Sequence, residues 1–582
     1  MVLKLSRTLM ASCCYLSSFV LVNWLTIQQS QAQNLELPPP QDVQPLPPEP
    51  PPTPPIPPQL PPPSDLLESP TQTPSSPQPL PDIPDTVTIK KFEFTGNTAF
   101  SQAELAKVLE PFTNKPISFA QLEEARLAVI QFYIDNKYIT SGAYIPVGQG
   151  IEDGVVEIVI VEGRLEDIQI SGNRRLKSDY IRSRIARATK APLNQEKLLE
   201  ALQLLQINPL IDNLSAELSA GTSPGLNVLS IKVEEAPTFG ITAGLDNNRS
   251  PSIGSFRRRI QLNQANLLGW GDGVSVGYSN TDGSNTFSAS YSLPINPRNG
   301  TLSFNYSTSD SDIIEDTFNE LDIESGSSNY DLTFRQPLMQ TPTQEFALGF
   351  TASRRDSQVS SEVLSDNGIP LNELSPGADE DGDTRISALR FFQEWISRNS
   401  REVIAARSQF SLGVGALNAT VNSDAPDSRF FAWQGEAQWT RLLARDTLLL
   451  IRGNLQLSSD RLLAGEQYSL GGIENVRGYR QNLLLRDNGA FASAEVQLPI
   501  FRLSKNGIVK LAPFVDIGTT WDNSDEENDD NTLASVGLGL RWRQGDNFNA
   551  RLDWGIPLIS VDKQGDSLQE NGLYFSVQYN PF

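Results

Sequence analysis

The octapeptide SVGLGLRW at residues 535–542 alternates small or charged side chains with large apolar ones. Two further stretches keep the same period of two, LLIRGNLQLS at 449–458 and FNARLDWGI at 548–556. Successive side chains of a β-strand point to opposite faces, so each stretch has one apolar face and one polar face. Arginine and aspartate opposite a continuous apolar stripe are typical of a membrane β-barrel with a wet interior. The pattern therefore predicts transmembrane strands.

Sixteen such segments can be counted from residue 238 to the C-terminus. An even number allows a closed antiparallel barrel without free edges. The links after even-numbered segments are short, whereas several after odd-numbered segments are long, as at 309–326, 355–383 and 460–487. Short turns on one side and long loops on the other are typical of an outer-membrane barrel, so we expect the long loops to face outward.

Composition excludes several classes of protein. The 582 residues carry a formal net charge of -23, which argues against nucleic acid as a partner. Hydrophobic residues make up 38% and the mean hydropathy is -0.30, too polar for a bundle of membrane helices. Acidic runs at 310–324, 379–383 and 525–530 fall in expected outer loops. We interpret them as solvated surface; calcium binding stays an alternative, although their spacing does not fit a helix-loop-helix site.

The N-terminal region divides into two expected segments. Residues 1–32 have a basic start, an apolar stretch and the small-residue pattern Ser30-Gln31-Ala32, which predicts a cleaved signal peptide; an uncleaved anchor is the alternative. Residues 33–85 are rich in proline and predict an extended, disordered spacer that enters no sheet. Both cysteines lie in the signal and the chain has no histidine, so cleavage leaves no Cys/His zinc site and no thiol or histidine catalysis. We expect no metal, no cofactor and no catalytic residue.

Two copies of a βααββ pattern follow the spacer, at residues 86–163 and 164–237. Each copy opens with a strand and a Gly-Asn turn, at 96–97 and 172–173. In such a module the middle strand normally forms a sheet edge, here 142–147. Its unpaired backbone groups can add a guest strand, with Ala143, Tyr144 and Ile145 as candidate contacts, although Pro146 can equally protect the edge.

Two motifs within the barrel region predict a lumenal ion pair. Val476-Arg477-Gly478-Tyr479 lies in the sixth expected outer loop, and Phe514-Val515-Asp516-Ile517-Gly518 lies on the thirteenth expected strand. Alternation directs Phe514, Asp516 and Gly518 into the lumen. If the loop folds inward, Arg477 can pair with Asp516, and Gly478 leaves space for a close approach. Arg541 also faces inward and can share the carboxylate.

Together, the two modules, the barrel and the two motifs resemble the transporter subunit of bacterial two-partner secretion, the haemolysin/filamentous-haemagglutinin transporter family. The resemblance covers about residues 86–582 and identifies the modules as polypeptide-transport-associated (POTRA) domains. It implies an outer-membrane protein with periplasmic POTRA modules, which passes an unfolded secreted exoprotein through its barrel and uses no cofactor. The implied loop latch comprises Val476, Arg477, Gly478, Tyr479, Phe514, Asp516, Gly518 and Arg541.

The resemblance also implies contact with outer-membrane lipid and with the barrel-assembly machinery, which recognises a terminal aromatic residue such as Phe582. Family members commonly have an N-terminal helix that plugs the barrel; the proline-rich spacer occupies much of that region here.

Three other functions are alternatives for this sequence. A barrel-assembly factor of the same superfamily is the nearest alternative, but it usually has more than two POTRA modules. A diffusion porin would not need the modules. The pattern GTSPG at 221–225 matches a hydrolase nucleophile elbow, yet no helix follows and no histidine exists to activate Ser223, so we expect a turn and not an enzyme.

Overall fold

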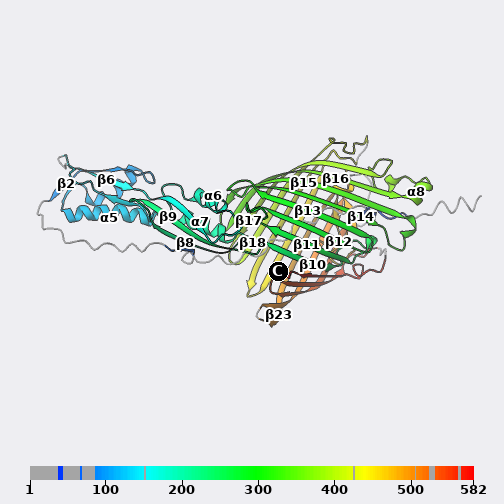
Figure 1. Ribbon diagram of the computed structural model, residues 1–582. Coiled ribbons are helices and arrows are strands. Elements are labelled where there is room, and N and C mark those ends of the chain that lie inside the picture. Colours follow the sequence, from blue (N-terminus) through cyan, green and yellow to red (C-terminus); the bar gives the residue numbers. More distant parts are fainter. Residues whose placement is uncertain are drawn as a thin grey trace, which may run out of the picture.

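The computed structural model describes residues 37–43, 66–68, 86–149, 153–423, 426–504, 506–523, 531–561 and 565–581. Two small α/β modules extend in line from one end of a large β-barrel (Figure 1). No helix of these residues has the length and apolar character needed to cross a bilayer.

The first module combines a mixed three-stranded sheet with two helices. Its sheet has the order β3-β6-β5, with β3 (Lys91–Thr95) parallel and β5 (Gly142–Tyr144) antiparallel to the central β6 (Val155–Val161). A capping box between Ser101 and Glu104 starts α4 (Gln102–Val108), and a second one, from Ser118 to Gln121, starts α5 (Phe119–Asp135). The remaining elements are η1 (Glu110–Phe112) and the strand pair β2 (Val87–Ile89) and β4 (Lys115–Ile117).

The second module repeats this plan with β7 (Arg164–Ser171), α6 (Ser178–Ala188), α7 (Gln195–Gln206), β8 (Ile211–Ala220) and β9 (Leu226–Glu235). The repeated Gly-Asn turns have the same geometry. Gly96 and Gly172 have φ of 80° and 83°, and the following Asn97 and Asn173 each donate a side-chain hydrogen bond of 2.8 Å to a carbonyl three residues later.

A carboxylate at the end of each module's last strand also binds the backbone after its Gly-Asn turn. Glu162 accepts hydrogen bonds of 2.7 Å from the amides of Thr98 and Ala99, and Glu235 accepts equivalent bonds from residues 174–176. Burial raises the pKa of Glu162, but the bonds from Thr98 and Ala99 outweigh it and hold the pKa below the usual value.

The barrel is closed and antiparallel, and it has sixteen strands as expected from the sequence. Its strands, in order, are β10 (Phe239–Asp246), β11 (Arg257–Ala265), β12 (Gly273–Asn280), β13 (Ser284–Pro294), β14 (Thr301–Asp312), β15 (Ile323–Gln340), β16 (Gln344–Ser361), β17 (Asp383–Arg398), β18 (Glu402–Val414), β19 (Phe431–Ala444), β20 (Thr447–Ser458), β23 (Asn488–Ser504), β24 (Gly507–Trp521), β25 (Thr532–Gln544), β26 (Phe548–Pro557) and β27 (Leu573–Tyr579).

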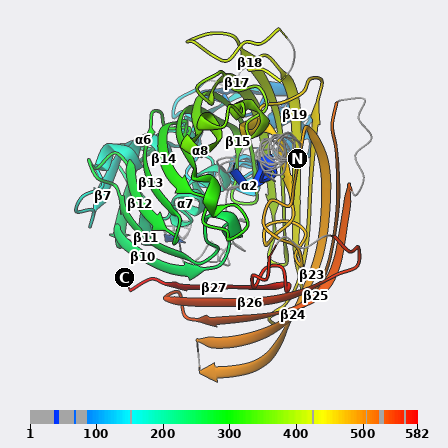
Figure 2. The ribbon, with the colours of Figure 1, turned by 90° about the vertical axis from the view of Figure 1, so that its right-hand side faces the viewer.

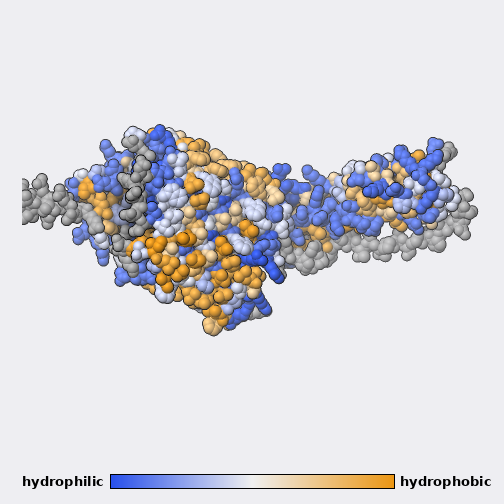
Figure 3. Space-filling model, turned by 180° about the vertical axis from the view of Figure 1, so that it is seen from behind, coloured by the Kyte–Doolittle hydropathy of each residue, from blue (hydrophilic) through white to orange (hydrophobic). Residues whose placement is uncertain are grey.

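Apolar side chains cover the outer wall of the barrel. Val536, Leu538, Leu540 and Trp542 on β25 are each 39–44% exposed, whereas the preceding Ser535 is fully buried on the lumenal side. A space-filling view shows the apolar colour gathered on the barrel and hydrophilic colour on the modules (Figure 3). An apolar outer wall and a polar interior suit a bilayer-embedded barrel.

The links between strands sort by length as predicted. The end near the modules has short turns, such as 266–272 and 295–300, and the opposite end has long loops. The long loops contain η2 (Pro251–Ile253), η3 (Asn319–Leu321), α8 (Glu362–Asp366), η4 (Leu371–Glu373), η5 (Ala464–Glu466), β21 (Tyr468–Leu470) and β22 (Leu484–Arg486).

The expectation that residues 33–85 enter no sheet is wrong for one short segment. β1 (Leu67–Glu68) pairs in parallel with β8, and Leu66 and Leu67 are buried in the core of the second module. Residues 64–69 have the sequence SDLLES, which contains no proline. They therefore keep the backbone N–H donors that a strand needs, and they supply two leucines to the core. A second segment forms α2 (Pro40–Val43), which lies inside the ring of strands at the outer end (Figure 2). The expected signal peptide and Phe582 fall outside the described residues.

Candidate functional site

The sixth outer loop, residues 459–487, folds back into the barrel as a hairpin. Its two limbs pair through β21 and β22, and Tyr468 aligns with Arg486. Apolar side chains of the hairpin pack against residues of the lumenal wall, in a cluster of Tyr468, Leu470, Val476, Tyr479, Phe491 and Leu533. The hydrophobic contacts and the short ladder fix the hairpin so that its tip, 471–483, reaches the wall formed by β23 to β27.

Arg477 at this tip is completely buried and binds Asp516 on β24 in the forked geometry expected. Its Nε lies 2.8 Å from Asp516 Oδ2 and its Nη2 lies 3.0 Å from Oδ1, while the backbone amide of Arg477 adds a third bond of 3.2 Å. The guanidinium lies 3.4 Å from the centroid of the Phe514 ring. A planar guanidinium suits this combination of a bidentate carboxylate and an aromatic face.

Two further carboxylates surround Arg477. Glu495 on β23 accepts a bond of 2.7 Å from Nη1, and Asp553 on β26 lies 3.3 Å from the same nitrogen. Arg541 binds Glu495 and Asp553, at 2.9 and 2.7 Å, and Arg551 also pairs with Asp553. The predicted sharing by Arg541 therefore involves these two acids and not Asp516.

The cluster balances three arginines against three carboxylates inside the barrel: Arg477, Arg541 and Arg551, with Glu495, Asp516 and Asp553. Removing one member leaves an uncompensated buried charge, which is more costly than the net value of any one pair. Glu495 and Asp553 were not among the residues predicted for this site. Their inward position in the alternation was a signal that could have found them.

Glycines allow the tip to touch the wall. Gly478 has φ of 102°, and a Cβ there would lie 3.2 Å from the carbonyl of Gly555 on β26. A Cβ on Gly555 would in turn lie 2.5 Å from the amide nitrogen of Gly478. The Gly478 amide donates to the Tyr574 hydroxyl at 3.0 Å, and that hydroxyl binds the Tyr479 carbonyl. Two facing glycines thus bring loop and strand into backbone contact.

The other motif residues complete this contact. The hydroxyl of Tyr479 lies 2.8 Å from the carbonyl oxygen of Ala534 and 2.9 Å from that of Ile559. A Cβ on Gly518 would lie 2.5 Å from Leu470 of the hairpin, so glycine makes room for this leucine. All eight residues of the expected latch therefore lie in or beside one contact between loop and wall.

A second ion cluster attaches the first limb of the loop to another part of the wall. Both oxygens of Glu466 bind Arg390 on β17, at 2.6 and 2.9 Å, and Arg355 on β16 lies 2.8 Å from Glu466. Arg355 also donates to the carbonyl of Gly465. The loop is therefore held by wall strands four or more places apart in the barrel order. Nothing in the sequence pointed to Glu466.

Arg480, which follows the motif, connects the loop to other outer segments. It binds Glu315 at 2.6 and 2.7 Å, Asp42 of α2 at 2.9 Å, and Glu570 at 3.5 Å. Asp42 also accepts a bond of 2.8 Å at its carbonyl from Ser252. Burial raises the pKa of Asp42 to about 6, although the Arg480 charge acts in the opposite direction.

The candidate docking strand β5 lies far from the latch, at the edge of the first module. It pairs with β6 on one side, and within the described residues no strand lies on its other side. Tyr144 is half exposed, whereas Ala143 is buried and Ile145 packs against the module core. The Ala143 carbonyl accepts a bond of 3.1 Å from Arg126. Pro146 follows the strand and is not part of it.

Ser223 lies in the turn between β8 and β9, where the amide of Leu226 donates to the Ser223 carbonyl at 3.0 Å. No group of three or more potential metal ligands occurs among the described residues. The acidic run at 525–530 lies outside them.

Family models match both parts of the chain. The model for haemolysin secretion/activation proteins ShlB/FhaC/HecB matches residues 225–542, more than half of the chain. The chain belongs to this family. A ShlB-type POTRA domain model matches residues 87–163, the first module. The family member described here is thus an outer-membrane transporter of two-partner secretion with its POTRA modules in the periplasm.

Individual relatives agree with the family. The chain is 25% identical over 504 residues to the outer membrane transporter CdiB of Escherichia coli O6:K15:H31 (strain 536 / UPEC), covering 82% of this chain and 79% of CdiB. It is 24% identical over 501 residues to the heme/hemopexin transporter protein HuxB of Haemophilus influenzae (strain 86-028NP), covering 81% and 83%. The solved structure of CdiB from Escherichia coli has the same fold, with a TM-score of 0.67, 22% identity, and coverage of 87% and 93%.

The assembly-factor alternative has weaker support. The outer membrane protein assembly factor BamA of Nitratidesulfovibrio vulgaris (strain Hildenborough) is 35% identical to this chain, but over only 120 residues, 19% of the chain.

Proposed function

We propose that this transporter captures one unfolded secreted protein on its POTRA modules and passes it outward through the barrel beside the clamped sixth loop. The observation that supports this most is the loop itself. It crosses the lumen and is held at Asp516 on one side and at Arg390 on the other. A simple pore would not need a charged clamp of this kind, whereas a protein conduit needs a fixed wall along which a chain can slide.

Docking on the modules would use strand addition. β5 offers one free edge, and β8 shows that the other module accepts an added strand, because β1 already pairs with it. Backbone hydrogen bonds provide affinity that depends little on sequence, which suits an unfolded partner. Ala143, Tyr144 and Ile145 would then contact the arriving chain.

Two further partners belong to this proposal. The apolar outer wall would contact outer-membrane lipid, and the barrel-assembly machinery would insert the protein. We propose that the chain is not an enzyme. The sequence has no histidine, and Ser223 lies in a hairpin turn.

A deletion strain tests the proposal and separates it from barrel assembly. We expect deletion of the gene to remove one large protein from the culture medium and to leave other outer-membrane barrels at normal levels, as measured by quantitative mass spectrometry. The wild-type gene should restore the missing protein, and an Arg477→Ala gene should not. Loss of many barrel proteins would instead favour an assembly factor and contradict secretion.

A further inference from the structure

Helix α6 of the second module lies against two periplasmic turns of the barrel. Near its start, Lys177 donates its amide to the Gly269 carbonyl at 3.0 Å and places its ammonium 3.7 Å from the centroid of the Trp270 ring. Further along, Arg184 binds the Asn299 side chain at 2.8 Å, and Arg187 binds the Pro297 carbonyl at 3.2 Å. The helix is therefore fixed to the rim of the barrel.

The turn that contacts Arg184 and Arg187 marks the periplasmic boundary of the bilayer. On the neighbouring β15, Leu332 and Phe334 face outward and are 48% and 40% exposed. The next residue on that face is Gln336, which accepts a bond of 2.7 Å from Asn296. Half-exposed Trp270 lies at the same rim, and tryptophan is enriched at membrane interfaces. At the end of β15 these amides alternate with apolar Leu338 and Met339, which are 60% and 41% exposed, and such a mixed surface suits the level of the lipid headgroups.

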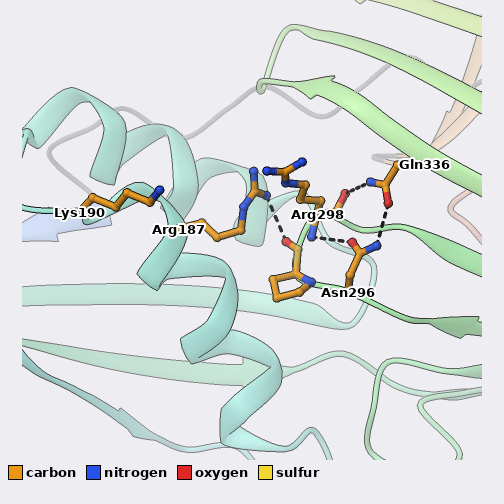
Figure 4. Close-up of a pocket in the computed structure, with 6 residues that line it drawn as sticks. Arg187, Lys190, Asn296, Arg298 and Gln336 are labelled. Carbon is orange, nitrogen blue, oxygen red and sulfur yellow. Dashed lines mark hydrogen bonds between the residues drawn. The ribbon is translucent and has the colours of Figure 1, made fainter.

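A basic hollow opens at this spot, between α6 and the turn. It has a volume of about 550 Å³ and is lined by Arg187, Lys190, Asn296, Pro297, Arg298 and Gln336. Arg187 and Arg298 point toward one another across it, and Lys190 comes from the segment after the helix (Figure 4). The hollow thus combines three cations with amide groups.

No carboxylate lines the hollow, although the chain has 69 acidic and 46 basic residues. Within the described part of the chain, none of its three cations forms an ion pair. Burial and the neighbouring Arg298 charge lower the pKa of Arg187. A smaller hollow shares Arg187 and Arg298 and adds an apolar wall of Leu204, Leu205 and Leu338. A ligand that fits both is negatively charged at one end and apolar at the other.

We propose that this basic hollow binds the phosphate group of an anionic phospholipid in the periplasmic leaflet, with the start of an acyl chain against Leu338. The three cations neutralise the phosphate, and Asn296, which donates one amide N–H to Gln336, supplies its other N–H to the phosphate. Bound lipid bridges the second module and the barrel, and so stabilises the orientation of the module. The site is separate from the loop clamp and does not depend on the proposed secretion function.

Lipid titration of the purified full-length protein tests this proposal. In native mass spectrometry from detergent, we expect phosphatidylglycerol to bind more tightly than phosphatidylcholine. The variant R187Q/K190Q/R298Q should bind phosphatidylglycerol roughly a hundredfold more weakly, since each of the three basic residues near an anionic lipid contributes roughly a factor of five. The heat-modifiable gel mobility of this triple variant should stay that of a folded barrel. The single change Arg298→Gln, in an exposed turn, should cause a smaller loss of lipid affinity.

A matched control removes the same charge elsewhere. Lys137, Arg164 and Lys197 are exposed residues near the junction of the two modules, and K137Q/R164Q/K197Q should bind lipid like the wild type. Equal binding of both lipids, or wild-type binding by R187Q/K190Q/R298Q, would overturn the proposal. Inorganic phosphate that competes at the same concentration as the lipid would also overturn it, because the site would then serve a soluble anion. Binding of an acidic peptide can be measured in the same way. If R187Q/K190Q/R298Q loses binding of this peptide but keeps wild-type binding of lipid, the hollow binds a protein partner instead.

Discussion

Arg477 is a buried cation whose shape matters as much as its charge. Its fork binds both oxygens of Asp516 while a third nitrogen binds Glu495. Lysine supplies one charge without the fork, and alanine supplies neither.

We therefore predict graded losses at Arg477. Arg477→Lys should keep part of the secretion, and Arg477→Ala should abolish it and destabilise the closed loop by about 3–5 kcal/mol, because buried carboxylates lose their partner. Export of the partner and protease cleavage within residues 471–483 measure the two effects. Arg461→Ala, an exposed arginine of the same loop, should change neither. Equal export by Arg477→Lys and the wild type would show that charge alone suffices.

Gly555 permits the backbone contact between β26 and the loop. Gly555→Ala adds one methyl group directly against the amide of Gly478, at 2.5 Å, in a position without the positive φ that favours glycine. We expect this variant to expose the loop to protease and to lower secretion severalfold, since neither backbone can move without breaking bonds.

A control separates this steric effect from backbone strain. Gly368 has φ of 71° with nothing within 4 Å of an added Cβ, so Gly368→Ala introduces only the strain of about 1–2 kcal/mol. It should leave secretion unchanged. Similar secretion by Gly555→Ala and Gly368→Ala would contradict the role of the close contact.

The sixth loop is attached to strands of the barrel wall by two ion clusters, and each can be released separately. Glu466→Gln keeps the shape of the side chain and removes the charge that binds Arg390 and Arg355. We expect the first limb, around residues 462–467, to become accessible while the tip stays bound through Arg477. Cysteine labelling at Ala464 and at Leu483 measures the two positions. Equal labelling of both would show that the loop moves as one rigid unit.

Local sequence predicts the strands better than it predicts this loop. Alternation correctly identified the lumenal side of Asp516 and Arg541, because a period of two follows from the backbone of each strand alone. It carried no information on Glu466, whose partner Arg390 lies 76 residues away in sequence. The pairing of Leu67 with β8 was not predicted for another reason. The many prolines around it indicated a spacer without strands, although the short segment between them can pair.

Four segments that are far apart in sequence meet at the outer end of the molecule. Arg480 of the sixth loop binds Asp42, Glu315 and Glu570, and Val43 packs into an apolar cluster with Ile313, Phe318 and Leu321. Segment 37–43 thus joins loops from both halves of the barrel. Its release would loosen all of them together, so this segment couples the N-terminal region to the outer end of the lumen.

The charge of Asp42 makes this coupling depend on pH. The pKa of Asp42 is about 6 in the docked segment, above the value of 3.8 for an exposed carboxyl. The docked state therefore holds the proton more tightly than the free segment. Docking is most favourable below about pH 4 and weakens, by up to about 3 kcal/mol, as the pH rises to 6.

We accordingly predict more frequent channel openings at pH 7 than at pH 4.5 for the full-length protein in planar bilayers, where single-channel current reports the state of the lumen. Asp42→Asn should remove most of this difference, because the amide does not titrate and remains docked at both values. Asp322→Asn, which changes an exposed carboxyl of a neighbouring outer loop, should retain it. Glu315 and Glu570 also face Arg480, so a pH response that persists unchanged in Asp42→Asn would assign the switch to them and not to the N-terminal segment.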